Sequence, residues 1–131
     1  HTGFTLVNQL VPHWKSVERI YFDGGNPDMR DAAVSLREGD WQEAGRLWKN
    51  LYDSLKKGKL KSRAAFNMAL ACEVQGVMDE AVSWIEKAKS CASKGSEEER
   101  AALFYSTVLQ ERAKDFQLLN LQMARFGNKI N

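Results

Sequence analysis

The stretch SRAAFNMALACEVQGVMDEAVSWIEKA, residues 62–88, decides the fold that the sequence predicts. Its apolar residues recur every three or four positions, the period of an α-helix, on both sides of Gln75-Gly76. Bulky apolar residues alternate with small ones, which stand where two helices would approach closely: Ala65, Ala69, Ala81 and Ala88. The stretch therefore predicts two amphipathic helices that pack against each other across a turn.

An earlier stretch, RDAAVSLREGDWQEAGRLWKNL (residues 30–51), carries the same pattern 37 residues before it. At this offset the glycine that ends the first helix recurs, because a left-handed backbone is cheap only without a Cβ. Six pairs of positions match in size and polarity: Ala32 and Ala69, Gly39 and Gly76, Trp41 and Met78, Ala44 and Ala81, Trp48 and Ile85, Leu51 and Ala88. The chain thus contains an internal repeat of one helix pair.

This repeat resembles the tetratricopeptide repeat, a helix–turn–helix unit of about 34 residues. The second unit also matches that family at Asn67, Gln75, Asp79, Glu80 and Lys87. The family's usual proline after the second helix is missing, with Lys56 and Ser93 in those places. The resemblance implies that the fold of the chain is all-α, with residues 23–131 as the repeat domain. That domain is expected to be a right-handed stack of antiparallel helix pairs, about two repeats plus a C-terminal capping helix or pair.

Local signals place the helix ends. Asn26-Pro27-Asp28 combines an N-cap, a proline at the first helical position and an acid that faces the helix dipole. Ser96 followed by Glu99 is a capping box. We expect helices near 27–38, 41–56, 61–75, 79–93 and 97–112, with a last one to about 126. Because 113–116 contains no glycine, one continuous helix over 97–126 is an open alternative.

Residues 1–22 form a separate N-terminal segment. Phe4, Val7, Leu10 and Val11 predict a helical face that ends at Pro12, and the alternation over 17–22 is a weak strand signal. With no partner strand recognised, we expect a helix followed by an extended chain.

The order of WKSVERIYF and GNPDMRDAAVSLREGDWQEAGRLWKNL looks like the C-terminal half of certain gut-bacterial lipoproteins of unknown function. In those proteins a helical repeat region follows an α/β domain. The resemblance implies that residues 1–22 are the tail of a missing domain. It also implies a lipoprotein anchored in the cell envelope on the periplasmic side, with a cytoplasmic location as the alternative.

Composition and motifs argue against several function classes. The net charge of +2 is small for a nucleic-acid binder, and no apolar run approaches the ~18 residues that span a bilayer. Gly24-Gly25 lacks the rest of a phosphate loop, and no Ser or Cys is placed for His1 or His13 to activate. Cys72 and Cys91 form no metal-binding pattern. We expect no enzyme, no cofactor, no metal, no nucleic-acid partner and no transmembrane segment.

The resemblance implies a concave groove lined by the first helix of each pair. Mapping the family's groove positions onto this chain selects Met29, Leu36, Arg37, Arg63, Phe66, Leu70, Glu73 and Phe104, with Ala33, Val74 and Val108 beside them. This groove is largely apolar and suits an amphipathic helix or an extended apolar peptide. The leading prediction is therefore a non-catalytic interaction or scaffold module whose protein or peptide partner the sequence does not identify.

Two alternatives use the same apolar surface. The groove is filled from within, either by an absent upstream domain or by the N-terminal segment, whose Phe4, Leu6, Val7, Leu10 and Trp14 also need an apolar surface. The repeats are then a rigid support without an exchangeable ligand. In the second alternative, an exposed apolar patch pairs copies of the chain as a homo-oligomer.

Overall fold

The computed structural model describes residues 3–12 and 15–130, with the side chains of 126–130 left out. This part of the chain contains five helices and one two-stranded antiparallel sheet. The expectations for His1, His13 and Trp14 fall on residues outside the described part.

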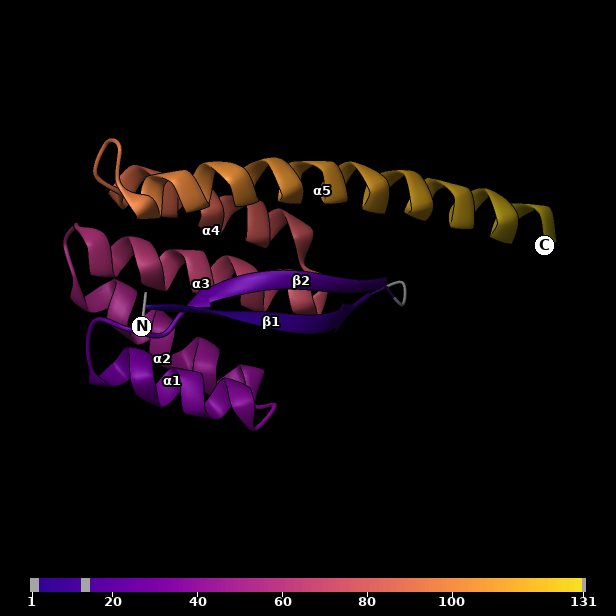
Figure 1. The fold of residues 1–131 in the computed structure, drawn as a ribbon. Coiled ribbons are helices and arrows are strands. Elements are labelled where there is room, and N and C mark those ends of the chain that lie inside the picture. The colour runs from indigo at the N-terminus through magenta and orange to yellow at the C-terminus, as the bar shows by residue number, and fades with distance from the viewer. Residues whose placement is uncertain (1–2, 13–14, 131) are drawn as a thin grey trace.

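The five helices form a stack (Figure 1). They are α1 (Pro27–Arg37), α2 (Trp41–Ser54), α3 (Lys59–Gln75), α4 (Met78–Cys91) and α5 (Glu97–Ile130). Each helix packs on the next along the chain, and short turns join α1 to α2 and α3 to α4. The predicted helix pairs are present, and residues 97–126 lie in one continuous helix, the alternative that the sequence left open.

The helix ends follow the predicted local signals. The Asn26 side chain accepts a hydrogen bond from the Met29 amide (2.9 Å), and the Ser96 hydroxyl accepts one from the Glu99 amide (3.1 Å). Gly39 and Gly76 have positive φ angles of 79° and 80°, which residues with a Cβ rarely adopt. The two turns within the helix pairs are therefore placed as predicted.

The repeated positions form the centre of the core. Ala32, Ala44, Ala69 and Ala81 are fully buried, which allows the helix backbones to approach closely. Trp48 and its counterpart Ile85 are also fully buried between neighbouring helices. The internal repeat is thus a repeat of packing as well as of sequence.

The prediction of an all-α fold is wrong, because residues 4–22 form a β-hairpin. Strand β1 (Phe4–Val11) pairs antiparallel with β2 (Lys15–Phe22), with Phe4 opposite Phe22 and Val11 opposite Lys15. Over a stretch as short as 4–11, the spacing of the apolar residues is compatible with a helix and with a strand. The strand predicted weakly over 17–22 therefore does have a partner strand, which is 4–11. The chain is a mixed α/β protein.

The hairpin lies along α3, on one side of the helix stack (Figure 1). Both of its strands contact α3, the first helix of the second pair. The last turns of α5 extend past the other helices, so this helix is packed along its first half and overhangs along its second. These two features, the docked hairpin and the overhang, set the surfaces that are described below.

Candidate functional site

The predicted groove residues divide into a buried set and an exposed set. Arg37 and Phe104 are exposed, Phe104 by 74% of its surface. The others are buried: Met29, Leu36, Arg63, Phe66, Leu70 and Glu73. On α3 the covering element is the hairpin, so the surface predicted as an open groove is closed there by residues of the same chain.

Asn67 fastens the end of β2 to α3. Its Oδ1 accepts a hydrogen bond from the Phe22 amide (2.9 Å), and its Nδ2 donates one to the Phe22 carbonyl (2.7 Å). The side-chain amide thereby satisfies both backbone groups of a residue that is itself only 1% exposed. The Phe22 ring packs edge-on against Phe66, with centroids 5.1 Å apart. Polar and apolar contacts together hold the strand on the helix.

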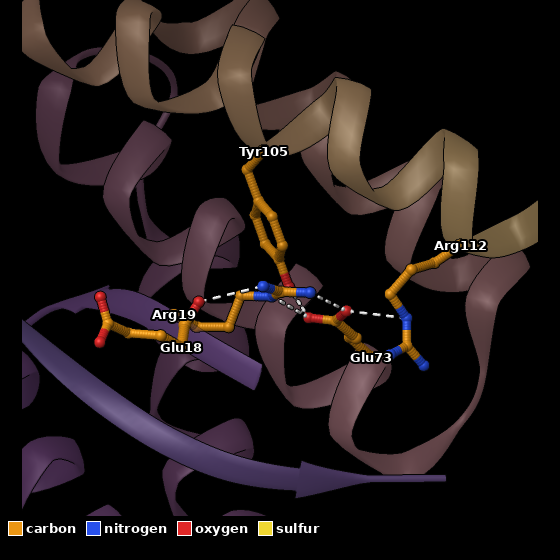
Figure 2. A network of polar contacts seen from close by, with 5 residues as sticks. All are labelled: Glu18, Arg19, Glu73, Tyr105 and Arg112. Carbon is orange, nitrogen blue, oxygen red and sulfur yellow. Dashed lines mark hydrogen bonds and ion pairs between the residues drawn. The ribbon is translucent and has the colours of Figure 1, made fainter. Parts of the chain in front are cut away.

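Glu73 is the centre of a buried polar network that joins β2, α3 and α5 (Figure 2). Arg19 donates hydrogen bonds to both carboxylate oxygens of Glu73, from Nε to Oε1 at 2.8 Å and from Nη2 to Oε2 at 2.9 Å. The Tyr105 hydroxyl donates to Oε1 at 2.7 Å, and Arg112 Nε forms an ion pair with Oε2 at 3.1 Å. One fully buried carboxylate therefore connects three separate segments of the chain.

The pKa values in the network follow from these contacts. Burial by itself would raise the pKa of Glu73, but the hydrogen bonds from Arg19 and Tyr105 and the positive charges of Arg19 and Arg112 outweigh it and lower that pKa below its ordinary value. Burial, together with the neighbouring Glu73 charge, raises the pKa of the Tyr105 hydroxyl well above its ordinary value. At neutral pH the network thus holds an ionised carboxylate and a neutral phenol.

The network contains two guanidinium groups for one carboxylate, an excess of one positive charge. Arg112 is 6% exposed, and its Nε–H lies near Glu73 in a geometry that does not meet that of a hydrogen bond. Its guanidinium also lies over the Phe116 ring, 5.2 Å from the centroid, where the ring face attracts a cation. Aromatic contact therefore offsets part of the uncompensated charge.

A second buried ion pair anchors the other end of the hairpin. Arg63 on α3 pairs with Glu98 on α5 at 3.0 Å, and it donates a hydrogen bond to the Gly24 carbonyl just after β2 (2.9 Å). The Arg63 guanidinium also lies 5.1 Å from the centroid of the Phe22 ring. Arg63, predicted as a groove residue, instead joins the hairpin to two helices.

The turn end of the hairpin packs on the α3–α4 turn. A Cβ placed on Gly76 would lie 2.9 Å from Cγ of Pro12, closer than real Cβ contacts occur. Gly76 is therefore required twice, for its positive φ angle and for this close approach.

An apolar cleft of about 200 Å³ remains between the hairpin and the first half of α5. The hairpin contributes Leu6 and Ile20, α5 contributes Phe104 and Val108, and Phe66 lies among the lining residues. Leu6 and Phe104, at the edge, are 60% and 74% exposed. Of the predicted groove residues, only Phe66 and Phe104 line this cleft, together with the neighbouring Val108.

Cys72 is a free cysteine buried on α3. Burial and the charge of Glu80 raise the pKa of the Cys72 thiol to about 11, so this free cysteine is not a thiolate at neutral pH. Over residues 3–12 and 15–130, no group of three or more His, Cys, Asp or Glu residues could hold a metal ion. In the same part of the chain, no helix is both long and apolar enough to cross a membrane.

Sequence reasoning selected Glu73 and Arg63 as groove residues but missed the partners that bury them. Arg19, Tyr105 and Arg112 were not singled out, because each lies far from Glu73 in sequence. One signal was available: α3 is apolar on nearly all sides, and Asn67 and Glu73 are polar interruptions in it. Such residues in a buried helix require polar partners from another segment.

Fold and site together define a stack of helix pairs that is closed on one side by a β-hairpin through a buried ionic network. The chain belongs to a family described as a domain of unknown function, DUF6340, which it matches over residues 30–111. The match runs from α1 into α5 and leaves out both strands and the overhang of α5. No curated protein and no solved structure matches the chain.

Proposed function

We propose that this chain is a non-catalytic scaffold that binds a protein partner in the apolar cleft between the hairpin and α5. The observation that carries the proposal is the exposure of Leu6 and Phe104 at the edge of a cleft whose lining is mostly apolar, with Glu18 and Arg19 as its charged residues. Large apolar side chains gathered around a hollow are typical of interaction sites in soluble proteins.

The hairpin favours this cleft over the groove that the tetratricopeptide resemblance implies. An exchangeable peptide on the concave face of α3 would have to displace contacts of Phe22 with Asn67 and of Arg19 with Glu73. Displacing Arg19 leaves a buried carboxylate with less compensation, which is costly. A partner in the cleft requires no such displacement. The partner's apolar side chains would contact Leu6, Ile20 and Phe104.

A second candidate function is a rigid support without an exchangeable ligand. The specific observation in its favour is the same closure of α3 by ion pairs and hydrogen bonds from the hairpin. In this case the helix stack and hairpin serve to hold another domain of a longer protein in place.

The test compares two substitutions on one strand. Leu6 and Leu10 are both exposed leucines of β1, but only Leu6 lines the cleft. Leu6→Glu should weaken binding of an apolar fluorescent dye to the cleft and reduce capture of cross-linked proteins from cells of the source organism, whereas Leu10→Glu should change neither. Burying a leucine contributes about 1.5–3 kcal/mol, so we expect a loss of about ten- to hundredfold.

Melting temperatures of both variants serve as the folding control, and neither should fall, because both side chains are more than half exposed. A set of captured proteins that is the same for the wild type and both variants would contradict the cleft proposal. That result would favour the rigid support.

A further inference from the structure

The outer face of α5 carries a continuous stripe of exposed residues at alternating spacings of three and four. Its centre consists of Phe104, Thr107, Glu111, Lys114, Leu118 and Leu121, all exposed. A helix that pairs with another helix along its length repeats apolar residues at these spacings, and three of the six positions here carry large apolar side chains. The opposite side of α5, which carries Tyr105 and Leu109, is the side that packs on the body of the chain.

Most of the stripe packs against no other part of the described chain, and only Phe104 is shared with the cleft. Phe104, Leu118 and Leu121 are 74%, 58% and 58% exposed, although each could bury its side chain against a partner. Glu111 and Lys114 form no ion pair in the part of the chain that the structure describes. A helix face with three large exposed apolar residues and two unpaired charges is typical of an interaction surface.

We infer that the occupant of this face is a second copy of the chain, with its α5 antiparallel to the first. A two-fold axis between positions 112 and 113 would place Glu111 of each copy beside Lys114 of the other. The interface would then contain two ion pairs, each between a glutamate and a lysine. The same axis would place Phe104 beside Leu121 of the second copy and Thr107 beside Leu118. Charged and apolar residues both match, because a two-fold interface pairs each position with its mirror position.

The position of the axis agrees with the extent of the helix. α5 runs from Glu97 to Ile130, so an axis between 112 and 113 lies close to its middle. The two helices overlap over nearly their whole length, about 45–50 Å at a rise of about 1.5 Å per residue. Each overhang then lies along the packed half of the other copy's α5.

A parallel arrangement is disfavoured by the same charges. In a parallel pair in register, Glu111 would face Glu111 of the second copy and Lys114 would face Lys114. Like charges directly opposite each other destabilise a helix pair, and complementary ones select its orientation. At the ends of the antiparallel pair, the same axis would place Arg125 of one copy opposite Arg100 of the other, with Glu97 at the next position of the stripe. Because both arginines are exposed, water screens the contact with Arg100.

This inference goes beyond the proposed function. The two surfaces share Phe104, but Leu118 and Leu121 do not line the cleft and Leu6 is not in the stripe, so these residues test the two surfaces separately. The measurement is the molecular mass of the whole chain in solution against concentration, by sedimentation equilibrium. We expect a species of twice 14.9 kDa at high concentration that dissociates on dilution.

Leu118→Glu should weaken the dimer at least tenfold, because it places a charge at an apolar contact in both copies. Met123→Glu is the matched control: Met123 is equally exposed, at 61%, but lies on the side of α5 away from the stripe. It should leave the dimer unchanged. Leu6→Glu should also leave the dimer unchanged, so failure of the cleft proposal and failure of this inference give different results.

A charge exchange tests the antiparallel register. Glu111→Lys alone and Lys114→Glu alone should each weaken the dimer, because each sets like charges opposite each other. The double variant should restore it, because the two ion pairs re-form with their signs exchanged. A chain that is monomeric up to millimolar concentration, or a dimer that tolerates Leu118→Glu, would overturn the inference. A double variant as weak as the single ones would overturn the antiparallel arrangement.

Discussion

α1 and α3 are the first helices of two repeated pairs, yet they have different surroundings. α1 lies at the edge of the stack, and four of its residues are buried, whereas α3 lies between α2, α4, α5 and the hairpin. At the 37-residue offset, Asn67 and Glu73 of α3 correspond to Arg30 and Leu36 of α1. The two helices therefore differ in residue type at the positions where α3 bonds the hairpin.

The comparison separates the positions of the repeat that pack helix on helix from those that contact the hairpin. The positions that pack helix on helix stay similar, as Ala32 and Ala69 do, and both are fully buried. The positions that contact the hairpin differ: they hold an exposed arginine and a leucine in α1, and a buried amide and a buried carboxylate in α3. Differences between the two repeats thus coincide with the surface on which α3 makes an additional contact.

The largest expected effect is at Glu73. Glu73→Gln keeps the side-chain volume but leaves Arg19 and Arg112 without their counter-charge, which should lower the free energy of unfolding by about 3–5 kcal/mol. Chemical denaturation measures this change. Arg37→Gln, at an exposed position of α1, is the control and should change stability by less than about 0.5 kcal/mol. Equal stability of the two variants would show that the network does not hold the hairpin.

The next largest effect is at Asn67, and it compares the same position in the two repeats. Asn67→Ala removes both hydrogen bonds to Phe22 and leaves the backbone amide and carbonyl of this buried residue without partners, which should lower the free energy of unfolding by about 1–3 kcal/mol. Arg30→Ala, the same position in α1, removes an exposed side chain and should be nearly neutral. Hydrogen exchange at the Phe22 amide should accelerate in Asn67→Ala alone. Unchanged exchange would contradict the contact.

The shared positions should respond alike in both repeats. Ala69→Leu and Ala32→Leu each force a larger side chain between closely packed helices, which should destabilise by about 1–3 kcal/mol through overpacking. Thermal melting measures both. If only one of the two substitutions lowered the melting temperature, the repeat in sequence would not be a repeat in packing.

The smallest expected effect is the dependence on pH. The folded-state pKa of Glu73 lies below its ordinary value of 4.5, so in acid the unfolded chain takes up the proton first. The stabilisation by Glu73 is therefore complete above about pH 4.5 and is lost as the pH falls through the folded-state value. The difference in unfolding free energy between the wild type and Glu73→Gln should shrink as the pH falls below about 4.5. A constant difference would contradict the assigned ionisation.

The helices could be predicted from the sequence because their signals are local. Asn26, Ser96, Gly39 and Gly76 act on backbone groups within a few residues, and the helix period is visible in any short window. The hairpin could not be predicted in the same way. Residues 4–11 are compatible with two periods, and what selects the strand is the pairing with 15–22 and the contact with α3.

The candidate site was predicted in part for the same reason. The tetratricopeptide resemblance pointed to Phe66 and Glu73 on the correct face of α3, but not to what covers that face. Burial of Glu73 depends on Arg19 and Tyr105, residues 54 and 32 positions away along the chain. Contacts between residues so far apart in sequence produce no pattern within a single segment. Only the polar residues Asn67 and Glu73, in an otherwise apolar part of α3, indicated that such contacts exist.

The hairpin has a consequence for the order in which the chain assembles during synthesis. Phe22 leaves the ribosome 45 residues before Asn67, and Arg19 leaves it 54 residues before Glu73. Until α3 has emerged, Val17, Tyr21 and Phe22 have no surface to dock on, although all three are buried in the finished protein. The hairpin is therefore synthesised before the surface that it covers, and its final contacts close loops of this length, which has an entropic cost.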